Sequence, residues 1–135
     1  KDKALRMILP SGTALHYHSP RTIEVETPWN ELTPALLHHG VNTVTRKWSE
    51  QRTYGGRLTE NAVQAIARDL LAEAMLRLDS RGWEIVLSVH DELVAECDEE
   101  FADLDAFTSL MEAAPKWASG CPIAAEGWIS GRYRK

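Results

Sequence analysis

The apolar pattern divides the chain into a strand-rich first part, 1–57, and a second part, 58–135, in which helix and strand alternate. At the start, residues 4–9 and 13–17 are mostly apolar, and Pro10-Ser11-Gly12 separates them. A proline-serine-glycine sequence between two such runs is a turn signal. The pattern therefore predicts an N-terminal β-hairpin.

Prolines interrupt the next stretch, and a proline cannot donate to a β ladder. We therefore expect residues 18–40 to be mostly loop, with at most one turn of helix. Within them Ile23 and Val25 alternate with glutamates, which predicts one short strand. Residues 41–48 are rich in Val, Thr and Trp and predict another strand, which Tyr54-Gly55-Gly56 would terminate. The prolines are Pro20, Pro28 and Pro34.

The clearest helical pattern runs from residue 59 to residue 81. Apolar residues recur there at three- and four-residue steps, as on one face of a helix. Thr59 is the expected N-cap and Gly82 the expected terminator. The apolar stripe, which we expect to face the core, contains Val63, Ile66, Leu70, Ala74 and Leu78.

Two β-prone runs follow, 83–89 and 93–97, and they predict a second hairpin with three ionisable residues at its tip. Asp98 would cap a further helix over 99–114, and 123–129 would form a last strand. This order predicts a single α+β domain, 1–135, built as an antiparallel sheet with helices packed on one face.

Composition fits a globular domain: 44% of the residues are hydrophobic, 26% are charged, and the net charge is −5. The apolar runs are all far shorter than the roughly 20 residues of a membrane span. Two cysteines are too few for a disulfide scaffold, which favours a reducing, cytoplasmic setting. The charge is +3 over 1–57, −11 over 58–115 and +3 over 116–135, so we expect the chain alone to bind DNA weakly.

His90, Asp91 and Glu92 at the second hairpin tip are the strongest candidates for chemistry. Carboxylates at a tight turn converge while staying hydrated, and such oxygens on rigid strands suit Mg²⁺. A bound Mg²⁺ could stabilise the attacking and leaving oxygens of a phosphoryl transfer. From the tripeptide alone, a solvated charged turn is the more common explanation.

The run Ser-Val-His-Asp-Glu-Leu-Val at 88–94 resembles the third palm motif of family A DNA polymerases, of the DNA polymerase I class. The preceding RLTENAVQAIARD resembles the long palm helix before that motif, and Trp117 with AEGW at 125–128 resembles the end of bacteriophage-type members. The resemblance covers residues 44–135 and extends more loosely to LPSG at 9–12. It implies a partial polymerase palm.

The resemblance also implies roles for single residues. Asp91 would be a ligand of a two-Mg²⁺ site of nucleotidyl transfer, Glu92 would support that site, and His90 would lie by the primer terminus. Gln64 and Arg57 would contact the primer–template duplex near the terminal base pair, in a minor groove that presents acceptors in every pair.

Asn61 would approach the templating base, although the family spaces this Asn and the following Gln four residues apart, and here the spacing is three. The family's other metal-binding aspartate lies in a motif like D-Y-S-x-I-E, and the chain has no match to it. A helix with Lys and Tyr-Gly that holds the incoming triphosphate is missing as well. We therefore expect Mg²⁺ binding only with the parent protein's missing carboxylate, and no activity from this chain alone. Primer–template DNA and dNTP would be partners of that parent, in a bacterial or phage-infected cytoplasm.

Two other functions remain open. A non-catalytic module could self-associate as a homo-oligomer through Trp29, Trp48 and exposed parts of the sheet. A small metal-dependent nuclease could use Asp91, Glu92 and an acidic neighbour. A zinc site made by the four histidines of the first part lacks a cysteine cluster at ligand spacing. Those histidines are His16, His18, His38 and His39.

Overall fold

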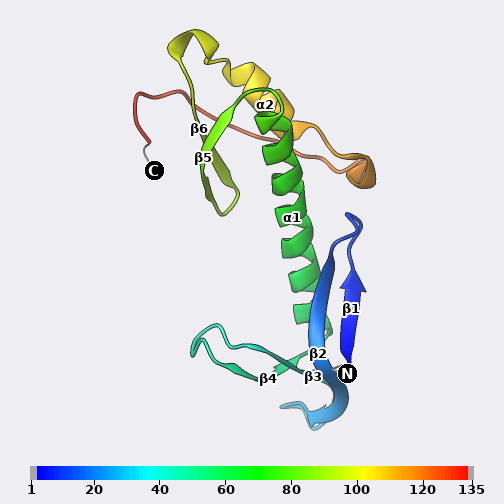
Figure 1. Cartoon of the computed structure of the whole chain (residues 1–135). Coiled ribbons are helices and arrows are strands. Elements are labelled where there is room, and N and C mark those ends of the chain that lie inside the picture. Colours follow the sequence, from blue (N-terminus) through cyan, green and yellow to red (C-terminus); the bar gives the residue numbers. More distant parts are fainter. Residues whose placement is uncertain (1–2, 134–135) are drawn as a thin grey trace. The chain divides into compact units, whose positions relative to one another are not determined.

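The computed structural model describes residues 3–133 (Figure 1). It confirms the α+β class, with a four-stranded antiparallel sheet, a two-stranded antiparallel sheet and two α-helices. The chain divides into two compact units, Lys1–Ala65 and Ile66–Lys135. The single domain expected for 1–135 stays a prediction.

The first unit holds the four-stranded sheet, in the order β1-β2-β3-β4. The N-terminal hairpin is confirmed, because β1 pairs antiparallel with β2. Its turn is closed by a hydrogen bond from the Leu9 N–H to the Thr13 carbonyl (2.9 Å), and Gly12 supplies the positive φ (90°) that the turn requires. The strands are β1 (Ala4–Ile8), β2 (Ala14–Glu26), β3 (Leu32–Val41) and β4 (Trp48–Thr53).

The loop expected over residues 18–40 is wrong, since β2 and β3 occupy most of it. Pro20 falls in the register shift between His18 and Arg21, where the ladder is already interrupted. Pro34 pairs with Glu24 on a part of β3 that β4 does not reach. Prolines are tolerated at bulges and on free strand edges, so neither of them ends its strand.

The strand expected over residues 41–48 is also wrong, because Val41 ends β3, Trp48 begins β4, and residues 42–47 between them form the turn. The Asn42 side chain accepts hydrogen bonds from the backbone N–H groups of Val44 (3.0 Å) and Thr45 (2.9 Å). A short amide side chain that bonds the backbone two residues on stabilises a turn. This local contact outweighs the β propensity of the Val and Thr residues around it.

The long helix is confirmed as α1 (Gly55–Asp79), and the boundary between the two units falls inside it. Thr59 is not the N-cap, since it lies one turn inside the helix and its hydroxyl donates to the Gly55 carbonyl (3.0 Å). Gly82 follows the helix with φ of 86°, as expected of a terminator. The next residue, Trp83, donates its N–H back to the Leu78 carbonyl (3.1 Å).

The second unit holds β5 (Glu84–Val89), β6 (Glu92–Glu96), η1 (Glu99–Phe101), α2 (Leu104–Glu112) and η2 (Lys116–Ala118). The helix expected over 99–114 is therefore interrupted. Its cap is Asp103, which accepts from the Ala106 N–H (2.9 Å), while the side chain of Asp98 caps nothing. The last strand expected over 123–129 is wrong, because the Ala125 N–H donates to a Glu112 carboxylate oxygen (3.0 Å) instead of a ladder.

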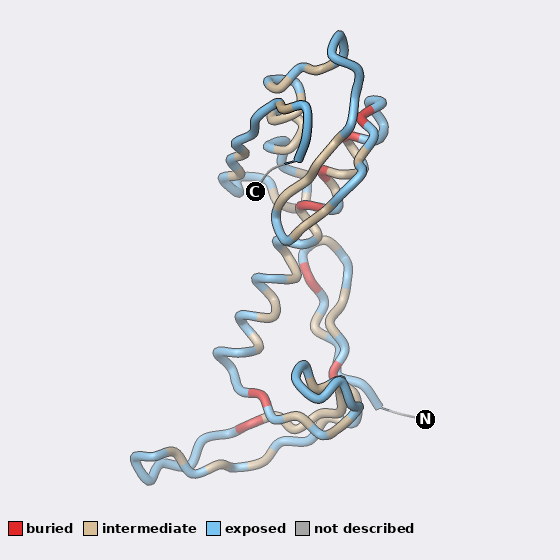
Figure 2. The backbone as a smooth tube through the Cα atoms, turned by 90° about the vertical axis from the view of Figure 1, so that its left-hand side faces the viewer, coloured by how far each residue is buried: buried red, intermediate tan, exposed pale blue. Residues whose placement is uncertain are grey.

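Each unit has a small core (Figure 2). In the second unit α1 contributes Leu78, which is fully buried, and Trp83 packs against Phe101 and Phe107 with ring centroids 4.7 and 5.0 Å away. Val63, expected in the core, is 60% exposed. No helix within residues 3–133 has the length and apolarity of a membrane span. The buried apolar residues are Leu9, Tyr17, Ala35, Leu71, Ala74, Leu78 and Trp83.

Candidate functional site

The second hairpin is confirmed, but its tip is shorter than predicted, because Glu92 belongs to β6 and not to the turn. Val89 of β5 pairs with Glu92 of β6, so His90 and Asp91 form a two-residue turn. His90 has φ of 54°. Two-residue hairpin turns require a positive φ at their first central residue, and histidine adopts that region more readily than most residues. The turn therefore holds Asp91 at the end of a paired ribbon.

Asp91 is exposed, and so is His90 beside it. None of the hydrogen bonds within residues 3–133 uses the Asp91 carboxylate. A hydrated carboxylate on a short turn is a suitable ligand for a hard cation such as Mg²⁺, which keeps several waters and takes one or two protein carboxylates. The geometry at Asp91 thus fits a metal ligand that needs further ligands from elsewhere.

Glu92 has a different environment. It is half-buried at the start of β6, and its Oε2 atom accepts a hydrogen bond from the Tyr133 hydroxyl (3.2 Å). Partial burial raises the pKa of Tyr133, and the hydrogen bond to Glu92 and its negative charge raise that pKa further. Because Tyr133 occupies one oxygen of Glu92, this carboxylate is held in place by the C-terminal segment.

The β5–β6 hairpin contacts the second half of α1 just after a backbone irregularity in β5. The register of β5 and β6 shifts between Ile85 and Leu87, which is a bulge on the strand leading to the turn. Beyond the bulge, the Ser88 hydroxyl accepts a hydrogen bond from Arg68 Nη1 of α1 (3.2 Å). This contact orients the ribbon that carries Asp91 within the second unit.

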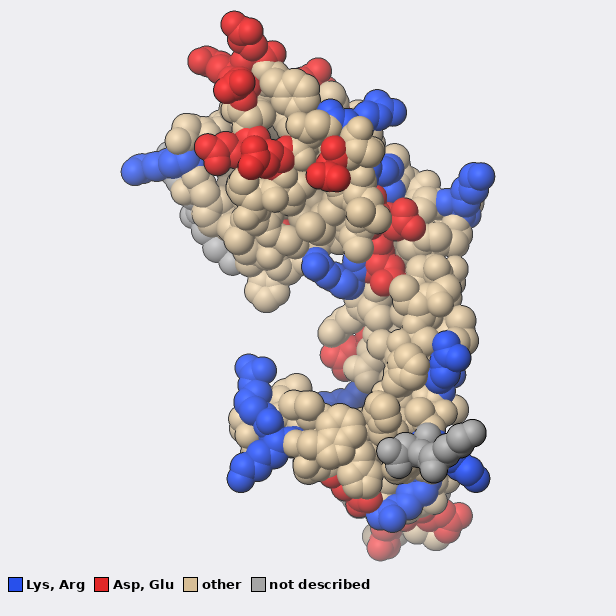
Figure 3. Space-filling model, viewed as in Figure 1, with Lys and Arg blue, Asp and Glu red and all other residues tan. Residues whose placement is uncertain are grey.

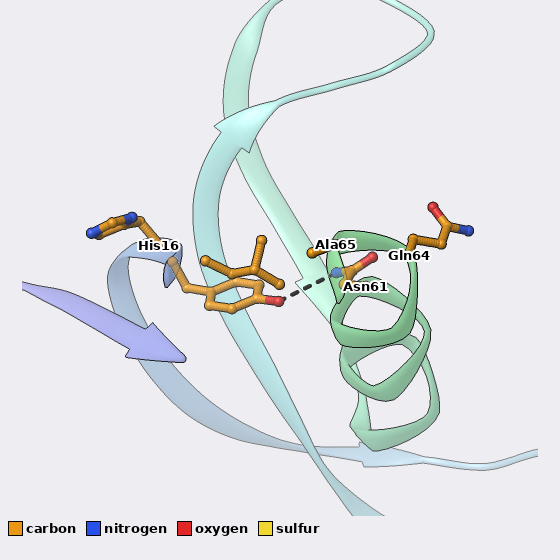
Figure 4. Close-up of a pocket in the computed structure, with 6 residues that line it drawn as sticks. His16, Asn61, Gln64 and Ala65 are labelled. Atoms are coloured by element: carbon orange, nitrogen blue, oxygen red, sulfur yellow. Dashed lines mark hydrogen bonds between the residues drawn. The ribbon is translucent and has the colours of Figure 1, made fainter. Parts of the chain in front are cut away.

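The predicted DNA contacts lie in the first unit, on the N-terminal part of α1. Asn61 and Gln64 line a hollow of about 370 Å³ together with Leu15, His16, Tyr17 and Ala65 (Figure 4). Asn61 Nδ2 donates to the hydroxyl of Tyr17 (3.3 Å), and the ring of Tyr17, only 5% exposed, packs edge-on against His38 at 5.0 Å. Asn61 is therefore anchored to the sheet.

Gln64 and Arg57 are exposed. The Gln64 amide donates to Glu60 Oε1 (3.2 Å), an exposed neighbour one turn earlier on the helix. Such a surface contact exchanges readily for a ligand because it is worth only a few tenths of a kcal/mol. Gln64 thus keeps a donor that a ligand in the hollow could use, whereas Arg57 does not line the hollow.

Replacing Tyr17 with Phe should lower the free energy of unfolding by about 0.5–1.5 kcal/mol, because it removes one intramolecular hydrogen bond and keeps the ring. Urea unfolding of both proteins measures the difference. Asn61→Ala should then lower the free energy of unfolding less in the Tyr17→Phe background than in the unchanged chain, because the two side chains share one hydrogen bond. Strictly additive losses would show that the contact has no energetic weight.

Sequence reasoning missed Tyr17, Arg68 and Tyr133 as supports of the candidate residues. Tyr17 and Asn61 lie 44 positions apart, and Tyr133 lies 41 positions from Glu92. Only a motif or a periodic pattern could have linked positions so distant, and the sequence contains neither for these pairs. The assignments of His90, Asp91 and Glu92 to catalysis, and of Gln64, Arg57 and Asn61 to DNA binding, stay predictions.

The structure gathers no further metal ligands around the candidate residues. Within residues 3–133 no three histidine, cysteine, aspartate or glutamate side chains are grouped so that they could hold a metal ion. His18 and His39 do face each other across β2 and β3, but the zinc alternative would need at least one more ligand beside them.

Comparison with known proteins finds a relative in a bacteriophage. The chain is 39% identical over 127 residues, 94% of its length, to a protein named DNA polymerase from Bacillus phage SP02. The chain spans only about a fifth (19%) of that relative's length. No protein-family model matches the chain, and no solved structure matches it. The chain is therefore similar to a segment of a phage DNA polymerase.

Proposed function

We propose that this chain is the C-terminal palm portion of a template-directed DNA polymerase of the family A type, which adds deoxynucleotides to a primer 3′ end. The observation that carries the proposal is the 39% identity, over nearly the whole chain, to a segment of a phage DNA polymerase. The identified motif at 88–94 and the exposed turn at its centre support the same conclusion.

Asp91 would be the protein's ligand for Mg²⁺ from this segment, with Glu92 as a more peripheral support. Bound Mg²⁺ supplies charge stabilisation to the attacking and leaving oxygens in nucleotidyl transfer. The carboxylate of Asp91 supports the first role, because it is exposed and takes part in no hydrogen bond among the described residues 3–133. The hydrogen bond from Tyr133 to Glu92 supports the second, because it holds that side chain through one oxygen, while the other makes no hydrogen bond within the part of the chain that the structure describes. His90 would lie beside the primer terminus.

Gln64 and Arg57 would contact the primer–template duplex directly. Both are exposed donors, and donors suit a minor groove that shows acceptors at similar places in every base pair. They would test the shape of a pair without reading its sequence. We assign Asn61 a positioning role, because its amide nitrogen is already bonded to Tyr17. In this role Asn61 fixes the start of α1 against the sheet that forms the other side of the hollow.

The isolated chain is expected to show no primer extension in Mg²⁺, because two-metal transfer needs carboxylates from more than one segment. Grafting the chain into the SP02 polymerase, in place of the segment that it matches, should give a hybrid that extends a primer. The measurement is gel-resolved extension of a labelled primer by both proteins. Extension by the isolated chain, or none by a hybrid that folds and binds primer–template, would contradict the proposal.

A non-catalytic interaction module is the second candidate. The observation that favours it is the number of large apolar side chains in solvent, among them Trp29 at 80% and Val44 at 87% exposure. Such exposure in a folded domain marks surfaces that contact another polypeptide. Light scattering of the purified chain discriminates: oligomers support self-association, and a monomer at high concentration counts against it.

A further inference from the structure

The end of the β3–β4 hairpin, residues 42–48, is a rigid projection that neither the predicted metal site nor the predicted minor-groove contacts use. We call it the β3–β4 tip. The Asn42 N–H donates to the Lys47 carbonyl (2.9 Å) and the Arg46 N–H donates to the Asn42 carbonyl (2.9 Å). With the two bonds that the Asn42 side chain accepts, four hydrogen bonds fix the turn. Side chains at the tip are therefore presented by an ordered backbone.

The β3–β4 tip carries positive charge that its surroundings do not neutralise. The sequence has no Asp or Glu between Glu31 and Glu50. Glu50 itself is paired with Arg21 (2.6 Å). Arg46 and Lys47 are both exposed, and within residues 3–133 neither makes an ion pair. Basic side chains project from this hairpin in Figure 3.

An aromatic ring adjoins the two cations. Trp48 begins β4 directly after Lys47 and is 58% exposed, with its partner across the ladder, Val41, exposed to the same extent. The ring packs against the ring of His18 in a T-shaped arrangement, at a centroid distance of 5.4 Å. Trp48 is thus held in place and still offers much of its surface to a ligand.

We propose that the β3–β4 tip binds single-stranded DNA, with Arg46 and Lys47 contacting phosphates and Trp48 stacking on a base. Basic groups beside an exposed aromatic ring are the combination that single-strand binders use, because every base has a face on which to stack. A duplex would offer phosphates but no free base face. The inference rests on the proposed function only in taking DNA as the ligand, and it needs neither a metal nor Asp91.

Two variants separate the two contacts. Arg46→Asn with Lys47→Gln removes both charges, and Asn is chosen because Arg46 has φ of 57°, a conformation that Asn tolerates. Trp48→Leu removes the ring and keeps an apolar strand residue. The matched controls are Arg81→Gln with Arg132→Gln and, separately, Trp128→Leu, all at exposed positions of the second unit.

Fluorescence anisotropy with a labelled 20-nucleotide oligo(dT), in EDTA and across a salt series, is the measurement. The charge variant should flatten the plot of log K against log salt by about 1.4, the expectation for two single-strand phosphate contacts. Trp48→Leu should weaken binding by about 5- to 150-fold at unchanged slope. The controls should leave both quantities unchanged.

Several results would overturn the inference. They are no measurable oligo(dT) binding by the unchanged chain at 50 mM salt, equal losses in the controls, or equal losses on a 20-base-pair duplex. Circular dichroism shows whether each variant folds. If the charge variant does not fold, Trp48→Leu alone still tests whether the β3–β4 tip binds single-stranded DNA. Because EDTA is present, failure here leaves the primer-extension test of the proposed function unaffected.

Discussion

Replacing Asp91 with Asn in the hybrid polymerase should lower the rate of nucleotide addition by at least about 10³-fold. The several kcal/mol that a bound metal supplies to transition-state charge correspond to a factor of this size. Asn keeps the shape and the turn but loses the negative charge that holds Mg²⁺. Single-turnover primer extension at saturating dNTP measures the rate, and the affinity for primer–template should change little.

Asp98→Asn is the matched control for Asp91→Asn. Asp98 is exposed in the same unit, and its side chain makes no capping hydrogen bond, so the variant removes the same charge from a position without a proposed role. A loss below about tenfold for Asp91→Asn, or equal losses in both variants, would contradict the role of Asp91 as a metal ligand.

Leu78→Ala should lower the free energy of unfolding of the second unit by about 2–5 kcal/mol. Leu78 is fully buried on α1, and truncation of a buried leucine loses its burial and leaves a cavity. Urea unfolding followed by tryptophan fluorescence is the measurement, because Trp83 is 7% exposed and donates its backbone N–H to the Leu78 carbonyl.

Leu76→Ala is the control for this prediction, two residues away on the same helix. Leu76 is 68% exposed, so its replacement should change the free energy of unfolding by no more than about 0.5 kcal/mol. Equal effects at both positions would mean that Leu78 does not lie on the buried face of α1.

Features that depend on nearby residues were predicted well from the sequence. The two hairpins have turns of Pro-Ser-Gly and His-Asp between β-prone runs, and both formed as expected. Helix α1 has an apolar repeat long enough to specify its type, and Gly82 ended it. In each case the turn chemistry and the hydrophobic period agree with the final structure, so no tertiary contact was needed to decide.

The errors arose where a distant partner or a single side chain decided the outcome. A proline such as Pro34 argues against a strand, yet Pro34 lies where β3 has only one neighbouring strand. Residues 41–48 have strand composition, but the Asn42 side chain stabilises a turn over residues 42–47, between the end of β3 and the start of β4. The strand expected over 123–129 was replaced by a segment bonded to Glu112, 13 positions before Ala125.

In the candidate site, too, the local features could be predicted from the sequence and the distant contacts could not. The sequence placed His90 and Asp91 at a hairpin tip, and the structure confirmed that placement. It could not show that Tyr133 holds Glu92 or that Tyr17 holds Asn61, because these pairs join segments about 40 residues apart. Those contacts determine that the Glu92 carboxylate is held in place and that the Asn61 amide is already hydrogen-bonded.

Metal binding by the hybrid polymerase tests the central claim, that the carboxylate at the β5–β6 turn is a metal ligand. Mn²⁺ titration followed by electron paramagnetic resonance, with primer–template and dNTP present, measures the metal bound. Asp91→Asn should weaken binding of at least one Mn²⁺ by more than about tenfold, since even outer-shell partners of a metal are worth that much. Unchanged Mn²⁺ affinity and stoichiometry in a folded Asp91→Asn hybrid would contradict the account.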